Sequence, residues 1–299
     1  MTSDTLVPAG PRGWCSTGET PVTENALTAT HSFELRPRTF KVTATTRLSE
    51  TLVRVRFSSD DDFEGFPAVA AEDHVKLFFD TDDAGDPVVP QLVDGRWNAR
   101  GLTYRDYTVR WFDPVNRRLD IDLVLHEHGV AGRWAATASP GDRLASLGPR
   151  GSFHVKDVFP WYVLAADETA LPALARWVEG LRPGVPVTAY VEVDGPGSHI
   201  DLPTEADLTL VWLHRDGAPA GSGTWLSDAI VAHDFPDREG FVWVAGESVG
   251  IKPARRFVKA AGFERDHWDV DGYWRRGTVN LDHHEEDEDD DEPAPATDA

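Results

Sequence analysis

The chain shows two different hydrophobic periods, which meet near residue 157. From Lys41 to about Lys156, apolar residues alternate with polar ones, which is the period of a β-strand with one buried face. In the run VRVRF (residues 53–57), valine and phenylalanine alternate with arginine, and turn-forming runs such as DTDDAGDP separate the segments. About six short strands of this kind predict an antiparallel barrel.

After residue 157 the period changes to that of an α/β domain. The run WYVLAA is almost wholly apolar, as expected for a parallel strand covered on both faces. Apolar residues then follow helical spacing in TALPALARWVEGLRPG, and further strands alternate with helices expected around 225–233 and 252–261, before a last strand near 268–274. We therefore predict a β + α/β fold, in which an N-terminal antiparallel β-barrel is followed by a C-terminal parallel α/β domain.

Composition divides the chain further. Residues 1–32 are rich in Thr, Gly and Pro and are predicted to be a flexible leader, while residues 282–299 hold ten acids and no Lys or Arg and are predicted to be a disordered acidic tail. Between them we expect a barrel domain at 33–157 and an α/β domain at 158–281.

Charge and cysteine content exclude several classes of protein. The 299 residues carry a net charge of −22, which argues against a general nucleic-acid or anionic-membrane surface. Cys15 is the only cysteine, so an internal disulfide, an iron–sulfur cluster or a cysteine zinc site is excluded. No apolar run is long enough to cross a membrane and no secretion signal opens the chain, so we expect a cytoplasmic protein without membrane insertion. The pair His283-His284 lies in the acidic tail and is expected to be a solubility feature rather than a fixed metal site.

Two clusters of residues could bind a phosphate-bearing ligand. Arg105 and Tyr107 share one face of a predicted strand and Thr108 follows, so a guanidinium, an aromatic ring and a hydroxyl lie close together. The alternative is an ordinary polar strand face. In the second cluster, a strand ending at His126 leads to small residues at the start of a short helix, whose backbone N–H groups favour a pyrophosphate. Together these clusters would hold a dinucleotide such as FAD.

Several motifs then identify a resemblance to a known family. The runs RDYTVRWFD, DLVLHEHGVAGRWA, ADETALPALARW, VWLHR, WVAGES and GYWRRG, together with EDHVKLFF, occur in the order and spacing of the siderophore-interacting protein family. The similarity spans about residues 33–280. The resemblance implies a flavoprotein of the ferredoxin-reductase-like superfamily that binds FAD, uses NAD(P)H as electron donor and reduces a ferric siderophore.

The resemblance also assigns residues to the flavin. The family's R-x-Y-S/T motif, which contacts the FAD phosphates and isoalloxazine, is matched here by Arg105, Tyr107 and Thr108. The family's second flavin segment is matched by His126, Gly129, Ala131 and Trp134. This chain departs from that segment, because Val130 stands in place of proline and Gly132 in place of serine. A hydroxyl contact to the pyrophosphate is therefore missing, although backbone amides could still serve.

The α/β half resembles the family's pyridine-nucleotide domain. It offers Asp167, Thr169 and Ala170 in the sequence ADETA, and Gly246 and Glu247 at a later strand end near the expected nicotinamide. Thr169 either caps the next helix or contacts nicotinamide or flavin. Arg215 ends a predicted parallel strand, where it either reads a 2′-phosphate or is a solvated strand end. Trp274 either shields the flavin ring or packs within the last strand.

Basic residues gather near the end of this half. Residues 250–280 hold seven Lys and Arg against four Asp and Glu. Lys252, Arg255 and Lys259 fall on one helical face together with Arg256, and Arg275 follows in GYWRRG. We expect these cations to bind an anionic ligand, either a nucleotide phosphate or an iron chelate; the alternative is a solvated helix face.

The resulting hypothesis is a ferric-siderophore reductase in which no protein acid or base is required for catalysis and no metal site is expected. Three alternatives remain open at this point. They are a general NAD(P)H:flavin oxidoreductase, a reductase that takes electrons from ferredoxin, and a non-enzymatic iron-chelate binder.

Overall fold

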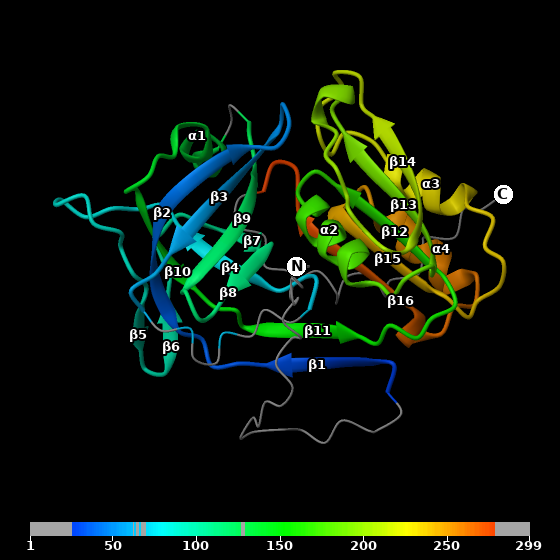
Figure 1. Ribbon diagram of the computed structural model, residues 1–299, viewed down its shortest axis with the longest axis horizontal. Coiled ribbons are helices and arrows are strands. Elements are labelled where there is room, and N and C mark those ends of the chain that lie inside the picture. The colour runs from blue at the N-terminus through cyan, green and yellow to red at the C-terminus, as the bar shows by residue number, and fades with distance from the viewer. Residues whose placement is uncertain (1–25, 62, 64–65, 67–69, 127–128, 279–299) are drawn as a thin grey trace, which may run out of the picture.

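The computed structural model describes residues 26–61, 63, 66, 70–126 and 129–278. The predictions for Cys15, for the tail from Asp282 and for His283 and His284 lie outside these residues. Two separate sheets dominate the described part, one formed by the N-terminal half and one by the C-terminal half (Figure 1).

The N-terminal sheet has seven antiparallel strands, in the order β7-β4-β10-β2-β3-β9-β8. It confirms the antiparallel, barrel-like architecture that the alternation predicts, in the form of a half-barrel. Its strands are β2 (Pro37–Arg47), β3 (Leu52–Ser58), β4 (His74–Phe78), β7 (Tyr104–Thr108), β8 (Trp111–Asp113), β9 (Arg118–Val124) and β10 (Arg143–Leu147). A short hairpin, β5 (Gln91–Val93) and β6 (Arg96–Asn98), forms a separate two-stranded sheet.

The alternation in VRVRF has a direct structural meaning. Val55 and Phe57 are fully buried in the barrel core, whereas Arg54 and Arg56 lie opposite Asp122 and Asp120 on β9 and bond to them at 2.7 Å. Opposite charges directly across an antiparallel pair stabilise one strand register. The helix α1 (Val130–Thr137) packs against β9 and β3.

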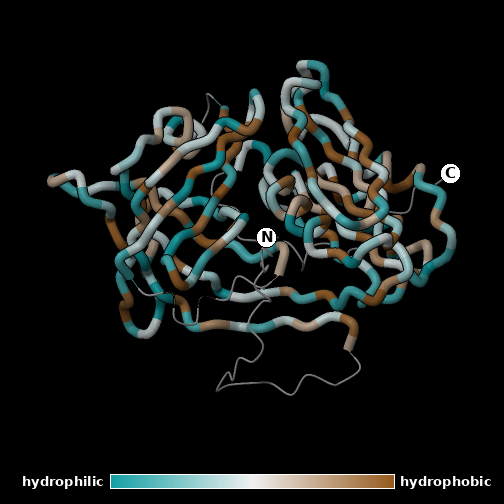
Figure 2. Tube along the Cα trace, in the orientation of Figure 1, coloured by the Kyte–Doolittle hydropathy of each residue, from teal (hydrophilic) through white to brown (hydrophobic). Residues whose placement is uncertain are grey.

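The C-terminal sheet is parallel, in the order β14-β13-β12-β15-β16, as predicted. Its strands are β12 (Tyr162–Asp167), β13 (Pro186–Val193), β14 (Asp207–His214), β15 (Phe241–Glu247) and β16 (Trp268–Trp274). The helix α2 (Leu171–Gly180) contributes to the core on one face, and α3 (Trp225–Ala232) and α4 (Lys252–Ala260) contribute to the core on the other. Hydrophobic segments follow the strands of this sheet (Figure 2), and every residue of β12 and β15 is buried. Two 3₁₀ turns complete the half, η1 (Pro196–Ser198) and η2 (Arg265–His267).

Part of the predicted leader has regular structure. Residues Thr28–Ser32 form strand β1, which pairs antiparallel with β11 (Gly151–Val155). The sequence TATHS shows no hydrophobic alternation, and its strand conformation comes from pairing with a partner distant in sequence. Because β11 connects the barrel to β12, this β1–β11 ribbon runs below both halves (Figure 1). Leu27 and Phe153 pack against the core of the parallel sheet.

The two halves contact each other at the carboxyl edge of the parallel sheet. In the turn between β2 and β3, the Thr51 hydroxyl donates to Glu168 Oε1 at 2.6 Å, and the Glu50 N–H donates to the Gly197 carbonyl at 2.9 Å. A second contact runs along α2, where Arg176 Nη1 donates to the Val109 carbonyl at 2.9 Å. Among the described residues, no helix has both the length and the apolar character needed to span a membrane.

Candidate functional site

The first candidate cluster lies on β7. Arg105 pairs with Leu77 and Tyr107 with Val75 across the β4–β7 ladder, so Arg105 and Tyr107 project from the same face, as the sequence predicts. Thr108 ends the strand and is 6% exposed. Arg105 Nη1 donates to the carbonyl of its neighbour Tyr104 at 2.6 Å. Burial raises the pKa of Tyr107, which therefore stays neutral.

The second cluster is built around the His126 side chain. Gly129 precedes α1 with φ 94°, a conformation that favours glycine, and it offers the helix no side-chain cap. The His126 ring packs against both glycines of the segment. A Cβ on Gly129 would lie 2.9 Å from His126 Cε1, and one on Gly132 would lie 2.6 Å from the His126 carbonyl oxygen. His126 therefore fills the space that a side chain at position 132, such as the serine of the family pattern, would need.

Ala131 and Trp134 are placed differently from each other on α1. Ala131 is buried in the first turn. Trp134 stacks on Phe57, with ring centroids 6.2 Å apart, and meets Phe79 edge-on at 6.0 Å, so its ring packs against the barrel core. Its role toward a flavin stays a prediction.

These two clusters meet the chemical demands of a pyrophosphate. Both β7 and α1 pack against β9. The N-cap residue of α1, Gly129, has no side chain to accept bonds from the first amides of the helix, and helix N-termini attract anions. An arginine guanidinium and uncapped amides are donors suited to a dinucleotide phosphate, so the residues present fit FAD.

In the α/β half, Asp167 organises the end of β12. Its Oδ1 accepts bonds from the Thr169 N–H at 2.8 Å, the Thr169 hydroxyl at 2.6 Å and the Ala170 N–H at 3.3 Å. Of the two alternatives for Thr169, the structure contradicts helix capping, because its hydroxyl donates to Asp167 and the N-cap residue of α2 is Ala170, without a side-chain cap. A contact with nicotinamide or flavin stays a prediction. Burial raises the pKa of Asp167, although these bonds oppose the shift.

The same aspartate binds the predicted shielding aromatic residue. Trp274 Nε1 donates to Asp167 Oδ2 at 2.7 Å. Gly246 lies against this pair, since a Cβ there would be 2.9 Å from Asp167 Oδ2. The structure thus brings together Asp167, Gly246 and Trp274 at the carboxyl edge of the sheet, where ligands of open α/β sheets bind.

A pocket of about 420 Å³ opens beside Trp274. It is lined by Gly221–Thr224, by Glu247, Val249 and Gly250, and by Arg275 and Arg276. The site residues predicted from the sequence do not include Gly221, Ser222 and Gly223, which form one wall of this pocket. The local signal is Gly221 with φ +64°, where a Cβ would lie 2.7 Å from Glu247 and 2.8 Å from Trp274.

Glu247 shapes this pocket through backbone contacts. Its carboxylate accepts the N–H groups of Val249 at 2.9 Å, Gly250 at 2.7 Å and Arg276 at 3.0 Å. The carboxylate therefore accepts the hydrogen bonds of two amides before α4, and it links this loop to the segment that follows β16. Arg275 and Arg276 are the basic residues among those that line the pocket.

Arg215 lies in a buried ionic cluster. It is 8% exposed, its Nη2 donates to Glu168 Oε2 at 2.6 Å, and its Nη1 lies 3.5 Å from Glu192 Oε1. The reading of a solvated strand end is wrong, because three strand ends converge around this side chain. Burial raises the pKa of Glu192 to about 7; the neighbouring Asp167 adds to this shift and Arg215 opposes it. Recognition of a 2′-phosphate by Arg215 stays a prediction.

The predicted substrate cations are exposed to different degrees. Arg256, Lys259 and Arg275 are exposed, whereas Lys252 and Arg255 are half-buried. Arg255 donates to the Val270 carbonyl, which fixes it against β16. The basic face of α4 therefore exists as predicted, and its ligand stays a prediction.

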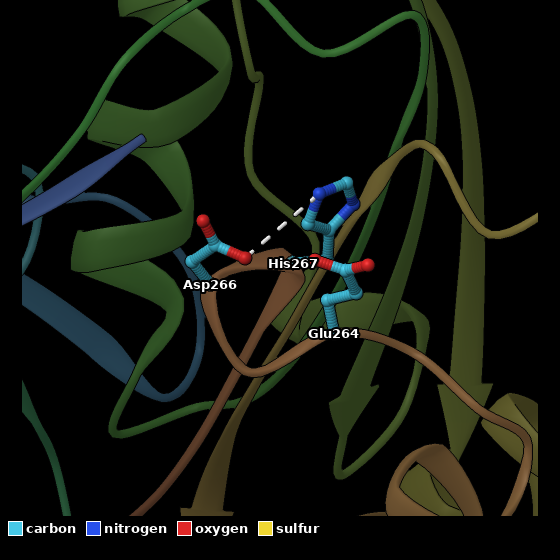
Figure 3. Close-up of side chains that lie close together, drawn as sticks. All are labelled: Glu264, Asp266 and His267. Carbon is cyan, nitrogen blue, oxygen red and sulfur yellow. Dashed lines mark ion pairs between the residues drawn. The ribbon is translucent and has the colours of Figure 1, made fainter. Parts of the chain in front are cut away.

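A separate cluster of metal-ligating side chains lies on the loop before β16 (Figure 3). Glu264, Asp266 and His267 bring their ligand atoms within 4.8 Å of one another, and His267 Nδ1 lies 3.2 Å from the Gly240 carbonyl. This loop is at the amino end of β16, whereas Trp274 is at the carboxyl end. The cluster is therefore remote from the candidate site.

Comparison with known proteins connects these features. Residues 41–153 match the model of the siderophore-interacting FAD-binding domain, and residues 159–277 match that of the siderophore-interacting protein. The solved structure of a siderophore utilization protein from T. fusca is 43% identical, with a TM-score of 0.80, over 86% of this chain and 99% of its own.

Two curated relatives have names that describe a reaction. The NADPH-dependent ferric-chelate reductase of Escherichia coli is 30% identical over 81% of this chain and 94% of its own length. The ferric vibriobactin reductase of Vibrio cholerae is 29% identical over 80% of this chain and 89% of its own. The matches cover both sheets, so the comparison concerns the two halves together.

Proposed function

Because the chain belongs to the siderophore-interacting protein family, we propose that it is a ferric-siderophore reductase that uses NAD(P)H and works in the cytoplasm. Its first half is an FAD-binding domain, and the protein is an oxidoreductase. The proposal extends this to the substrate, a siderophore-bound Fe(III), and to the product, Fe(II), which the chelate then releases.

One observation carries the proposal: the barrel and the carboxyl edge of the parallel sheet meet. The Thr51 hydroxyl contacts Glu168 in the loop directly after Asp167, and Glu50 contacts Gly197 beyond the end of β13. The candidate flavin residues and the candidate nicotinamide residues therefore belong to halves held in direct contact. Hydride transfer requires such an arrangement, because the two rings must approach closely.

The chain's own residues would position the ligands. Arg105 and the first amides of α1 would hold the phosphates, and Tyr107 would pack against the ring. Trp274, held by Asp167, would lie where nicotinamide enters, so it must move for reduction to occur. FAD, when bound, supplies the chemistry that links two-electron donors to one-electron acceptors. Hard oxygen donors hold Fe(III) more tightly than Fe(II), so reduction would weaken the chelate.

The test is an anaerobic spectrum of the purified protein. We expect flavin bands that bleach with NADPH or NADH and return when a ferric siderophore is added, with Fe(II) captured by a chromogenic trap. If the reduced flavin is reoxidised equally fast without the chelate, the protein is a general flavin reductase. If only reduced ferredoxin bleaches the flavin bands, the electron donor is ferredoxin rather than NAD(P)H. A colourless protein that takes up no FAD would contradict the proposed enzymatic function.

Arg105→Ala is expected to weaken FAD binding by about 10- to 100-fold, because a charge-assisted contact to phosphate contributes about 1.5–3 kcal/mol. The measurement is the Kd for FAD of the apoprotein, followed by flavin fluorescence. Arg96→Ala, on the exposed hairpin strand β6, is the matched control and should bind FAD normally. Full flavin occupancy in purified Arg105→Ala protein would refute the assigned role.

A further inference from the structure

Two basic residues line the pocket, and four more belong to the helix that follows its wall. Arg275 and Arg276 line the pocket together with Val249 and Gly250, and the chain runs from Gly250 directly into α4. The helix carries the other four cations, Lys252, Arg255, Arg256 and Lys259. We call these six residues the basic rim. It is a local concentration of positive charge in a protein whose net charge is −22.

The acidic tail starts close to this rim along the chain. Asp282 follows Arg276 by only six residues, and residues 285–292 are eight consecutive acids. The family match ends at residue 277, so the tail lies beyond the part shared with the family model. It is an addition whose charge is opposite to that of the nearest described surface.

Chain length allows the tail to reach the whole rim. An extended chain spans about 3.3–3.6 Å per residue, so the six residue steps from Arg276 to Asp282 cover about 20 Å. The nine residues of α4 rise only about 14 Å. Residues 282–292 can therefore follow α4 from Lys252 to Lys259 without any displacement of the described fold.

We propose that residues 282–292 bind the basic rim of the same chain and compete there with anionic ligands. A short tether gives a segment a local concentration in the millimolar range, which favours it over a free acidic partner. Eight acids facing up to six cations form many weak pairs at once, and each pair is screened over about 8 Å at physiological salt. The competition rests on the proposed function, whereas the contact between tail and rim does not.

The direct test uses the five lysines of the full-length chain, which are Lys41, Lys76, Lys156, Lys252 and Lys259. A carbodiimide joins a carboxylate to an amine only when the two are in contact, and mass spectrometry then locates the bonds. We expect tail carboxylates to couple to Lys252 and Lys259 at least fivefold more than to the exposed Lys41. Coupling should be intramolecular at micromolar protein and should fall severalfold in 0.5 M NaCl.

A charge reversal tests the rim without removing either amine. Arg256→Glu keeps both α4 lysines and should lower their coupling to the tail severalfold. Arg96→Glu, on the separate β5–β6 hairpin, should leave coupling unchanged. Coupling spread equally over Lys41 and the rim, coupling between different molecules only, or no coupling to the tail would each overturn the proposal.

The competition has its own readout. We expect a full-length variant with residues 285–292 changed to Gln or Asn to show a severalfold lower KM for an anionic ferric chelate at low salt. The difference should vanish in 0.5 M NaCl and should be absent for a neutral chelate. An unchanged KM would reject the competition. Because crosslinking requires neither flavin nor turnover, a failed reductase assay would leave the tail contact standing.

Discussion

Gly132→Ala is expected to destabilise the protein by about 1–3 kcal/mol, the usual cost of overpacking, and to weaken FAD binding at least tenfold. A Cβ at this position would lie 2.6 Å from the His126 carbonyl oxygen and 2.8 Å from His126 Cδ2. Because the nearest atom is backbone, α1 must shift away from the loop that leads into it. That shift would displace the amides on which phosphate binding depends.

Helix propensity alone predicts the opposite sign, because alanine is more favourable than glycine in a helix by about 1 kcal/mol. Gly180→Ala, at the end of α2, is the matched control, since a Cβ there meets no atom within 4 Å. We expect Gly180→Ala to be neutral or stabilising. Urea denaturation of the apoprotein and titration with FAD measure both effects, and a more stable Gly132→Ala protein with normal FAD affinity would refute the clash.

Arg215→Met is expected to cost about 3–5 kcal/mol of stability at pH 8, because it removes the cation from a buried ionic cluster. The side chains of Glu168 and Glu192 are 9% and 8% exposed and would lose their shared partner. If Arg215 serves instead to read a 2′-phosphate, the variant should keep its stability and lose only its preference for NADPH over NADH. The two readings therefore predict different measurements.

The pH dependence of this loss follows from Glu192. Its pKa is raised from 4.5 to about 7 in the folded protein, so protonation favours the folded state. This contribution is fully present below about pH 4.5 and is lost as pH rises through 7. Without Arg215 the carboxyl would hold its proton more strongly, so Arg215→Met should be least impaired at pH 5.5.

Urea denaturation at pH 5.5 and pH 8 checks the pH dependence. Arg36→Met is the control, because Arg36 pairs with Glu34 at 3.4 Å on the surface, where both side chains are well exposed. Such a pair contributes about 0–1 kcal/mol. An Arg215→Met protein as stable as the control at pH 8 would contradict the role of the cluster.

Much of the fold was predictable because its signals are local. Alternation in residues 53–57 indicates a barrel strand, and the last strand was expected near its observed position, Trp268–Trp274. Strand β1 escaped prediction because its residues gain their conformation only by pairing with β11. The β-propensity of these five residues does not indicate that they pair with a strand more than a hundred residues later in the sequence.

The site was predictable only as a set of positions. Sequence spacing placed Arg105 and Tyr107 on one strand face. It could not reveal that Arg215 contacts two acidic side chains, Glu168 after β12 and Glu192 in β13. That arrangement depends on strand order, which aligns the ends of β12, β13 and β14. The sequence left the role of Thr169 open for a similar reason, because the acceptor of its hydroxyl, Asp167, becomes apparent only in the folded turn.

The β1–β11 ribbon also sets an order for events during synthesis. Thr28 pairs with Val155, so β1 leaves the ribosome before the whole barrel and cannot form its ladder until β11 has emerged. Unpaired strands in growing chains are open to aggregation, especially when they carry large apolar side chains. The sequence TATHS carries none, so β1 has little tendency to pair incorrectly or to aggregate during the time before β11 is synthesised.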